Sequence, residues 1–416
     1  MILICNIILL LLIIVCIIIS NINGEDFIMR LKYLNRIVSY IAVSALFSAT
    51  AVNAAPSSEE MWQTIQEQQK VIEQLQEQID ATAEAVETGD GGGGASWADQ
   101  TYIGGYGELH YRGGDGTDNV DFHRFVLYFG HDFNDRVHFF SEVELEHALA
   151  GEGQPGEVEL EQAWIEIDLT ENHRFRAGLD ILPIGLINVN HEPNTFYGVE
   201  RPEVEKRIIP ATWWEAGLGF NGEIAPGVNY DIVLHSGMET TTNIRSGRQK
   251  VADANAEHPA GTARIRYTGV PGLELSASLH HQSNIEATTT DQGSNEATLF
   301  QTHVDYKHSS GLGLRALYAG WDMERDLSTD GKDSDGWYIE PSYRWKAGMG
   351  ELGVYARYEE IDRSRTGARF EEERYSTGFN YWPTVQVAFK FTYETVEDVD
   401  ASTNTDNFYF GIGYQF

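Results

Sequence analysis

Nine arginines and one lysine recur after residue 100 at positions that alternate with apolar or aromatic residues. They are Arg124, Arg174, Arg176, Arg264, Arg266, Arg315, Arg344, Arg357, Arg374 and Lys390. In an extended segment Val385 and Phe389 share one face, so Lys390 lies on the other. A guanidinium presents planar, paired N–H donors that match phosphate or carboxylate oxygens. A row of such groups on one polar face would guide an anion.

Carboxylates occupy the same polar face. They are Glu142, Glu144, Glu146, Glu166, Asp168, Asp231, Glu274, Asp305, Glu340 and Glu359. Two interpretations therefore stay open at this point. The arginines bind passing anions, or the two sets form an ion-pair network that stiffens the structure.

Residues 185–211 form a long segment without alternation. Three prolines restrict its backbone, and its basic residues are interleaved with acidic ones. The charged residues are Glu192, Glu200, Arg201, Glu203, Glu205, Lys206 and Arg207. Because a structureless loop of this length is usually functional, we expect it to narrow a channel. The alternative is an external loop that covers the rim.

Enzymatic and metal-binding patterns are weak. Histidines such as His123, His131 and His138 occur singly, and adjacent His280 and His281 point to opposite faces of a strand. The segment 333–336 is similar to a calcium loop but lacks its length and closing glutamate, so we interpret it as a turn. The sequence predicts no catalytic residues, no metal site and no cofactor.

The elements that carry these residues have the period of two that is typical of β-strands. Sixteen alternating segments start near residues 102, 120, 136, 158, 173, 212, 228, 262, 272, 297, 312, 335, 351, 371, 384 and 405. Ten residues at ~3.4 Å each, tilted by ~45°, rise ~24 Å, which matches the ~25 Å apolar band of an outer-membrane barrel.

The connections support the same architecture. Those after even-numbered segments are tight, down to Trp382-Pro383, whereas 185–211 and 239–260 are long. Short turns at one end and long loops at the other are typical of outer-membrane barrels. A soluble β-sandwich also alternates, but it would bury the charged face. We therefore predict an all-β fold over 102–416, a 16-stranded antiparallel transmembrane β-barrel.

The N-terminal part divides into four segments. Residues 1–28 are interpreted as an extension upstream of a mistaken start codon, with a membrane anchor as the alternative. Residues 29–54 read as a secretory signal peptide, with a basic start, an apolar centre and small residues at its end. Residues 55–88 carry apolar residues at a 3.5-residue period, which predicts a short α-helical coiled coil; a solvated helix or disordered spacer is the alternative. Residues 89–101 form a glycine-rich linker.

Composition excludes several classes of protein. The chain has 63 acids against 29 bases and a net charge of −34, so a nucleic-acid partner is not expected. Its two cysteines are Cys5 and Cys16, so neither a disulfide framework nor a cysteine zinc site is possible beyond them. After Ala55 no apolar run is long enough for a spanning helix.

Several stretches resemble the phosphate-selective porins O and P, and more closely their relatives with an N-terminal coiled coil. They are 103–110, 121–146, 192–201 continued through Trp213-Trp214-Glu215, and the C-terminal Phe416 after Tyr414, Ile412 and Phe410. The resemblance implies a trimeric 16-stranded outer-membrane channel whose third external loop folds inward. It also implies that the barrel-assembly machinery reads Phe416. The family's phosphate specialists have strongly basic lumens with lysine clusters, whereas lysine is scarce here.

These observations predict a porin in the outer membrane of a Gram-negative bacterium. We expect it to pass small hydrophilic solutes, with a preference for anions such as phosphate or small organic acids. Expected partners are outer-membrane lipid and lipopolysaccharide, two further copies of the chain, and peptidoglycan near a periplasmic coiled coil. The alternatives are a non-selective porin, an envelope-tethering barrel with little conduction, and an outer-membrane hydrolase.

Overall fold

The computed structural model describes residues 97–416 except 117, 287–292 and 402. The predicted upstream extension, signal peptide and coiled coil lie outside the described residues, as does most of the glycine-rich linker. Those assignments stay predictions. No helix among the described residues is both long enough and apolar enough to span a membrane.

The described residues form sixteen strands and three short helical segments. The strands are β1 (Thr101–Gly114), β2 (Asn119–Asn134), β3 (Val137–Glu146), β4 (Val158–Asp168), β5 (His173–Ile181), β6 (Trp214–Ala225), β7 (Val228–His235), β8 (Ala260–Val270), β9 (Leu273–Gln282), β10 (Ala297–Lys307), β11 (Leu312–Met323), β12 (Asp335–Ala347), β13 (Gly350–Asp362), β14 (Glu371–Thr384), β15 (Val387–Asp398) and β16 (Thr403–Gln415). The helical segments are η1 (Trp97–Gln100), α4 (Glu203–Arg207) and η2 (Arg245–Gly247).

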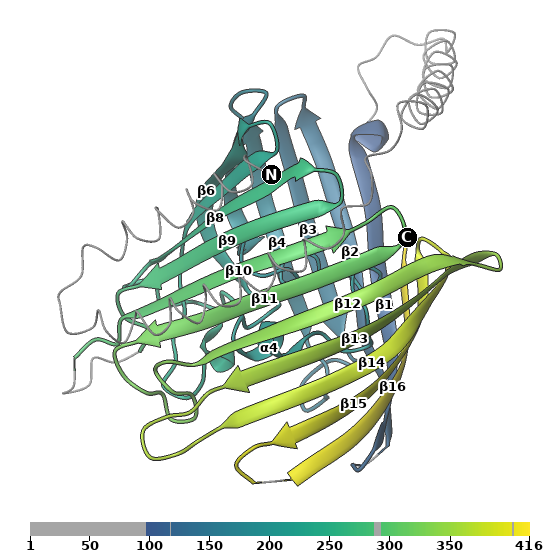
Figure 1. The fold of residues 1–416 in the computed structure, drawn as a ribbon. Helices are drawn as coiled ribbons and strands as arrows, with labels where there is room; N and C mark the ends of the chain where they lie inside the picture. The colour runs from purple at the N-terminus through teal and green to yellow at the C-terminus, as the bar shows by residue number, and fades with distance from the viewer. Residues whose placement is uncertain (1–96, 117, 287–292, 402) are drawn as a thin grey trace. The chain divides into compact units, whose positions relative to one another are not determined.

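All sixteen strands of this described region join in one closed barrel (Figure 1). Each strand pairs antiparallel with its neighbours in the chain, and β1 pairs with β16, where Gly107 lies opposite Tyr414. Closure leaves no strand edge with unpaired backbone groups, which is a requirement for a sheet in lipid. The prediction of a 16-stranded antiparallel barrel is confirmed.

The predicted turn at Trp382-Pro383 is wrong by a few residues. β14 continues to Thr384, and the register shifts between Tyr381 and Thr384 before the strand pairs with β15 at Val387. Pro383 therefore lies in a β-bulge. Proline is tolerated at a bulge because no ladder hydrogen bond is needed there, so it does not end the strand.

Alternation separates an apolar outer face from a polar inner face. On β15, Phe389 and Tyr393 are exposed on the outside, whereas Lys390 and Glu394 are buried on the inside. A charge on the outer face would cost ~2–4 kcal/mol at the centre of a bilayer. The inner face therefore collects the charged residues.

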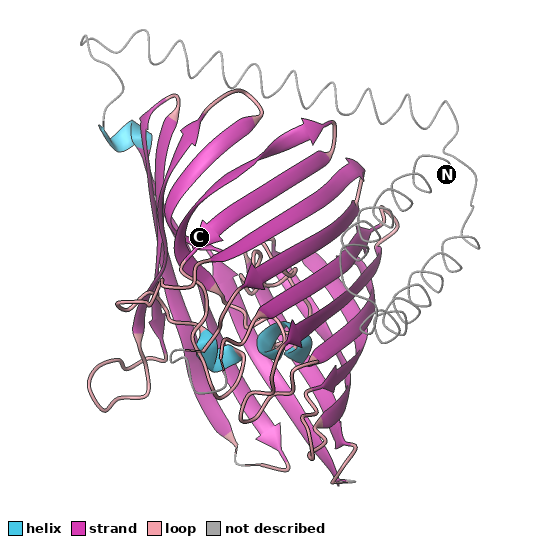
Figure 2. Ribbon diagram, turned by 90° about the vertical axis from the view of Figure 1, so that its left-hand side faces the viewer, coloured by secondary structure: helices cyan, strands magenta, loops and turns pink. Residues whose placement is uncertain are grey.

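The segment between β5 and β6, residues 182–213, runs through the interior of the barrel and is called loop L3. Its helix α4 lies inside the ring of strands (Figure 2). Ile208 and Trp213 of L3 belong to a buried apolar cluster with Leu299 and Trp321 of the wall. The indole Nε1 of Trp321 donates a hydrogen bond of 2.8 Å to the carbonyl of Ile208. Part of the barrel interior is thus an apolar core shared by L3 and the wall.

Candidate functional site

Glycines on the inner wall make room for the first half of L3. A Cβ at Gly413 would lie 2.5 Å from Cβ of Pro193, and one at Gly353 would lie 2.5 Å from the Tyr197 hydroxyl. These contacts are too close for any side chain other than hydrogen. Small residues on β13 and β16 therefore let the loop pack directly on the wall.

The acids of L3 mainly hold the loop in place. Glu205 is fully buried and accepts hydrogen bonds from the backbone N–H groups of Leu186 (2.8 Å) and Ile187 (2.5 Å). Its other oxygen accepts a bond of 2.7 Å from the Tyr338 hydroxyl of β12. Burial raises the pKa of Glu205 despite these donors. This carboxyl group joins two parts of L3 to the barrel wall.

The remaining charged residues predicted for the loop have separate partners. Glu192 accepts a bond of 3.4 Å from the Tyr128 hydroxyl, and Glu200 lies 3.3 Å from Nδ1 of His110. Burial would raise the pKa of Glu200, but His110 outweighs it and lowers that pKa well below its usual range. Within α4, Glu203 pairs with Arg207 one turn later.

Nine of the ten basic residues predicted to bind anions form ion pairs with carboxylates among the described residues. The pairs are Arg124 with Glu108 (2.5 Å), Arg174 with Asp168 (2.9 Å), Arg176 with Glu166 (2.7 Å), Arg264 with Asp231 (2.8 Å), Arg266 with Glu274 (3.9 Å), Arg315 with Asp305 (3.2 Å), Arg344 with Glu351 (2.5 Å), Arg357 with Glu359 (2.8 Å) and Arg374 with Glu372 (2.9 Å). This arrangement favours the ion-pair network over a free row of anion-binding groups.

The tenth residue, Lys390, has no carboxylate within 4.0 Å in the described part of the chain. Its Nζ lies 3.8 Å from the ring centroid of Phe196 in L3 and makes no hydrogen bond there. The side chain is 4% exposed, so L3 covers it. Lys390 therefore faces L3 instead of open solvent.

Three wall arginines line an open part of the interior. Arg176, Arg264 and Arg266 border a cavity of about 310 Å³ together with Pro183 and Val189 of L3. The cavity lies on the side of the barrel formed by β4 to β8. It provides space for small solutes beside L3.

Three arginines from two loops lie close together. The sequence does not predict this grouping. Arg201 belongs to L3, and Arg245 and Arg248 belong to residues 236–259, called loop L4. Arg245 donates to the carbonyls of Lys206 (2.9 Å) and Ala211 (2.6 Å), Arg201 donates to Oγ1 of Thr212 (2.9 Å), and Arg248 donates to the Thr212 carbonyl. We call these three residues the loop arginine cluster.

The loop arginine cluster forms no ion pair with a carboxylate of the described residues. The guanidinium groups donate hydrogen bonds to neutral oxygens, and no carboxylate in the described part of the chain lies within 4.0 Å of them. Burial lowers the pKa of Arg245, and the neighbouring charges of Arg248 and Arg201 lower it further. The mutual repulsion favours a bound or passing anion.

Glutamates of β3 and β4 lie near this cluster. Burial lowers the pKa of Arg248, and Glu159 and Glu161 partly offset that effect. Lys250 of L4 pairs directly with Glu159 and, at 2.8 Å, with Glu157. The passage near L4 is therefore bordered by guanidinium groups of the loops and carboxylates of the wall.

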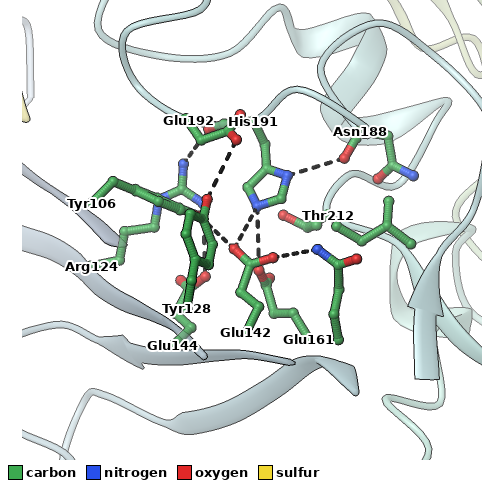
Figure 3. A network of polar contacts seen from close by, with 12 residues as sticks. Tyr106, Arg124, Tyr128, Glu142, Glu144, Glu161, Asn188, His191, Glu192 and Thr212 are labelled. Atoms are coloured by element: carbon green, nitrogen blue, oxygen red, sulfur yellow. Dashed lines mark hydrogen bonds and ion pairs between the residues drawn. The ribbon is translucent and has the colours of Figure 1, made fainter. Parts of the chain in front are cut away.

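A second cluster also lies at the contact between L3 and this wall. Nε2 of His191 lies 3.2 Å from Oε1 of Glu142 and 3.4 Å from Oε2 of Glu161 (Figure 3). Burial would lower the pKa of His191, but the two carboxylates outweigh it and raise the pKa to about 10. Neither His191 nor Glu161 is among the site residues predicted from the sequence.

A β-bulge explains why strand parity does not reveal Glu161. On β4, Gln162 pairs with Glu142 of β3 and Leu160 pairs with Val143, so Glu161 is an extra residue between them. A bulge re-aims a side chain and shifts the alternation by one residue. Both Glu161 and Gln162 consequently contact groups of the interior.

Comparison with known proteins identifies the class that this barrel and its inward loop define, the outer-membrane porins. Residues 103–416 match the family model described as "Phosphate-selective porin O and P". Because the match covers most of the chain, the protein belongs to the phosphate-selective porin O and P family. The family and the fold support an outer-membrane channel in preference to an enzyme.

Individual relatives are more distant. An uncharacterized protein of Aquifex aeolicus (strain VF5) is 32% identical over 234 residues, which are 53% of this chain and 50% of the relative. The chain thus spans about half the length of the curated relative it matches.

Solved porins share the fold at low sequence identity. OmpF of Salmonella typhi, in complex with daunomycin, is 14% identical with a TM-score of 0.57, and the match covers 76% of this chain and 97% of OmpF. An anion-selective porin from Comamonas acidovorans is 12% identical with a TM-score of 0.54, and the match covers 76% of this chain and 99% of that porin. At these identities the comparison shows the fold alone.

Proposed function

We propose that the protein is a passive diffusion channel for small hydrophilic solutes with a preference for small anions, such as phosphate or small organic acids. The observation that carries this proposal is the loop arginine cluster of Arg201, Arg245 and Arg248. Its guanidinium groups have no carboxylate partner among the described residues, unlike nine of the ten basic residues predicted on the wall. L3 acts as the constriction, and L4 adds two of the three arginines.

The chemistry of the cluster suits anions with several oxygens. Guanidinium groups donate parallel N–H bonds to phosphate and carboxylate oxygens, and they keep their charge at any physiological pH. The nearby glutamates of β3 and β4 reduce the positive potential of the arginines at a distance. An anion is therefore attracted to the cluster but is not held tightly there. Weak binding of this kind is what conduction requires.

The lysines argue against strict phosphate selectivity. Lys390 is covered by L3, and Lys250 is occupied by Glu157 and Glu159. A cluster of free lysines, which the resemblance predicts for phosphate specialists, is not formed by these two residues. Small organic acids therefore fit the site as well as phosphate does.

The assembly of the channel is part of the same proposal. A homotrimer, a periplasmic coiled coil over 55–88 and contacts with lipopolysaccharide follow from the family resemblance and the N-terminal sequence pattern. Phe416 pairs its backbone with Gly105 through bonds of 2.9 and 3.0 Å, so the C-terminal residue takes part in closing the barrel. This position supports recognition of Phe416 during barrel assembly.

The anion preference is tested by the reversal potential of the purified channel in a planar bilayer under a KCl gradient. We expect a reversal potential on the chloride side for the wild type and a shift toward zero for the double variant Arg245→Gln/Arg248→Gln. Arg369→Gln is the matched control, because Arg369 is exposed and pairs with Glu371 outside the interior. A wild-type potential on the potassium side would contradict the proposal.

A further inference from the structure

The cluster of His191, Glu142 and Glu161 has the composition of a metal site. One imidazole nitrogen and two carboxylate oxygens, one from each residue, lie within 4.8 Å of one another. The three residues are 3%, 1% and 2% exposed in that order, so bulk water has little access to them. They come from three different elements, L3, β3 and β4, which the fold brings together.

The contacts of His191 with the two carboxylates are long for charge-assisted hydrogen bonds, and their lengths also match a shared ion. A bond between an imidazolium and a carboxylate is usually ~2.7–2.9 Å long. The separations from Nε2 of His191 are 3.2 Å to Glu142 and 3.4 Å to Glu161. With metal–ligand bonds of ~2.0–2.2 Å, the edge of a zinc tetrahedron is ~3.3–3.5 Å. The observed separations are close to that edge.

Two neighbouring groups orient the side chains of His191 and Glu142. Nδ1 of His191 lies 3.1 Å from the Asn188 carbonyl, so its N–H donates there and Nε2 is directed at the carboxylates. Nε2 of Gln162 donates a bond of 2.5 Å to Oε2 of Glu142, and Oε1, which also accepts a bond of 3.3 Å from the Tyr106 hydroxyl, faces His191. Histidines that bind metals usually donate their other N–H to a carbonyl or carboxylate in this way.

The Oε2 atom of Glu161 is buried and accepts no hydrogen bond of normal geometry in the described structure, although it lies 3.4 Å from Nε2 of His191. The residue as a whole is almost fully buried. Figure 3 shows this carboxylate below the His191 ring, beside that of Glu142. A buried carboxylate oxygen without a donor is costly, and a cation would satisfy it.

The surrounding charges also permit a divalent cation. The carboxylates near the site are those of Glu142 and Glu161 together with Glu108 and Glu144, which lie around Arg124. Arg124 pairs with Glu108 and Glu144, so the carboxylates of Glu142 and Glu161 have no guanidinium partner among the described ion pairs and are left for the ion to balance.

We propose that His191, Glu142 and Glu161 bind one divalent transition-metal ion, with zinc as the best fit, and that this ion fastens L3 to the wall of the barrel. Borderline nitrogen and hard oxygen donors in a small closed site are typical of zinc. The ion takes the place of the proton on Nε2, which passes to solvent. Three protein ligands leave a fourth position for a water molecule.

The proposal is tested with the full-length protein purified in detergent, treated with EDTA, and then dialysed against dilute Zn²⁺ before metal analysis. We expect one zinc ion per chain for the wild type. His191→Ala and the isosteric Glu161→Gln should lose this ion. Gln162→Leu removes the donor that orients Glu142 and also the acceptor of the Trp164 indole N–H, and it should weaken zinc binding by about 10–100-fold.

His110→Ala is the matched control. His110 also contacts two carboxylates, Glu108 at 3.0 Å and Glu200 at 3.3 Å, but through its two different ring nitrogens, so it cannot hold one ion between them. This variant should keep its zinc. Wild-type protein without zinc, or equal zinc in the wild type and His191→Ala, would overturn the proposal. Heat-dependent mobility on a gel confirms that each variant is folded.

Discussion

Charged residues inside this barrel differ in their interactions although they occupy equivalent positions in the sequence pattern. Arg357 pairs with both Glu340 (3.1 Å) and Glu359 (2.8 Å) in a site that is almost completely buried. Lys390 is equally buried but has no carboxylate partner among the described residues. Alternation shows that both side chains point inward, but it does not show their partners.

Removing Arg357 should therefore destabilise the barrel strongly. Arg357→Met leaves two carboxylates buried without their cation, and breaking a buried pair in this way costs about 3–5 kcal/mol. Urea unfolding followed by gel mobility or tryptophan fluorescence measures the change. A loss below about 1 kcal/mol would show that water reaches the carboxylates and that the network is not structural.

Replacing Lys390 should have the opposite result. Lys390→Met removes a buried charge without breaking an ion pair, and the methionine keeps the contact with Phe196. A buried cation without a partner disfavours the folded state, so we expect unchanged or higher resistance to urea. A marked loss of stability would mean that the Lys390 ammonium group has a stabilising partner other than Phe196.

At the scale of elements, we propose that the position of L3 decides the width of the passage. Glu205 connects Leu186, Ile187 and Tyr338, so Glu205→Ala removes the central fastening of the loop. We expect a larger single-channel conductance and the entry of larger uncharged polymers. Glu171→Ala, in an exposed turn, should leave both unchanged. Equal conductance in Glu205→Ala and the wild type would show that L3 does not limit the current.

The strands could be predicted from the sequence because each one has to satisfy lipid on one side. Because of that requirement, apolar and polar residues alternate along the strands of residues 102–416. Every predicted strand start lies within three residues of a strand start in the structure. The errors have local causes. Pro383 lies in a bulge, and the bulge at Glu161 reverses the parity of β4.

The loops could not be predicted to the same degree, because no period links a loop residue to the wall it touches. L3 was expected to lie inside on account of its length, prolines and charges. The contribution of Arg245 and Arg248 depends on how L4 folds over L3, which the sequence pattern does not contain. The same holds for His191, whose partners are about 30 and 49 residues away along the chain.

At the scale of the whole molecule, the barrel closes on itself without the N-terminal residues. The described strands complete the ring from Thr101 to Gln415, and every strand has both of its neighbours. Deleting residues 57–88 should therefore leave single-channel conductance unchanged. If the predicted coiled coil tethers the envelope, the same deletion should increase the sensitivity of cells to detergent.

That experiment separates the channel from the envelope-tethering alternative. A deletion variant that conducts normally supports a barrel that works by itself. If the deletion abolished conduction while gel mobility still showed a folded barrel, residues 57–88 would be part of the channel, contrary to this account.

The central claim is that L3 narrows the barrel interior without closing it. The most direct measurement is the current through a planar bilayer after addition of the purified protein. The structure predicts stepwise increases of uniform size that are proportional to voltage. A folded, membrane-inserted protein that produced no current steps would contradict the claim.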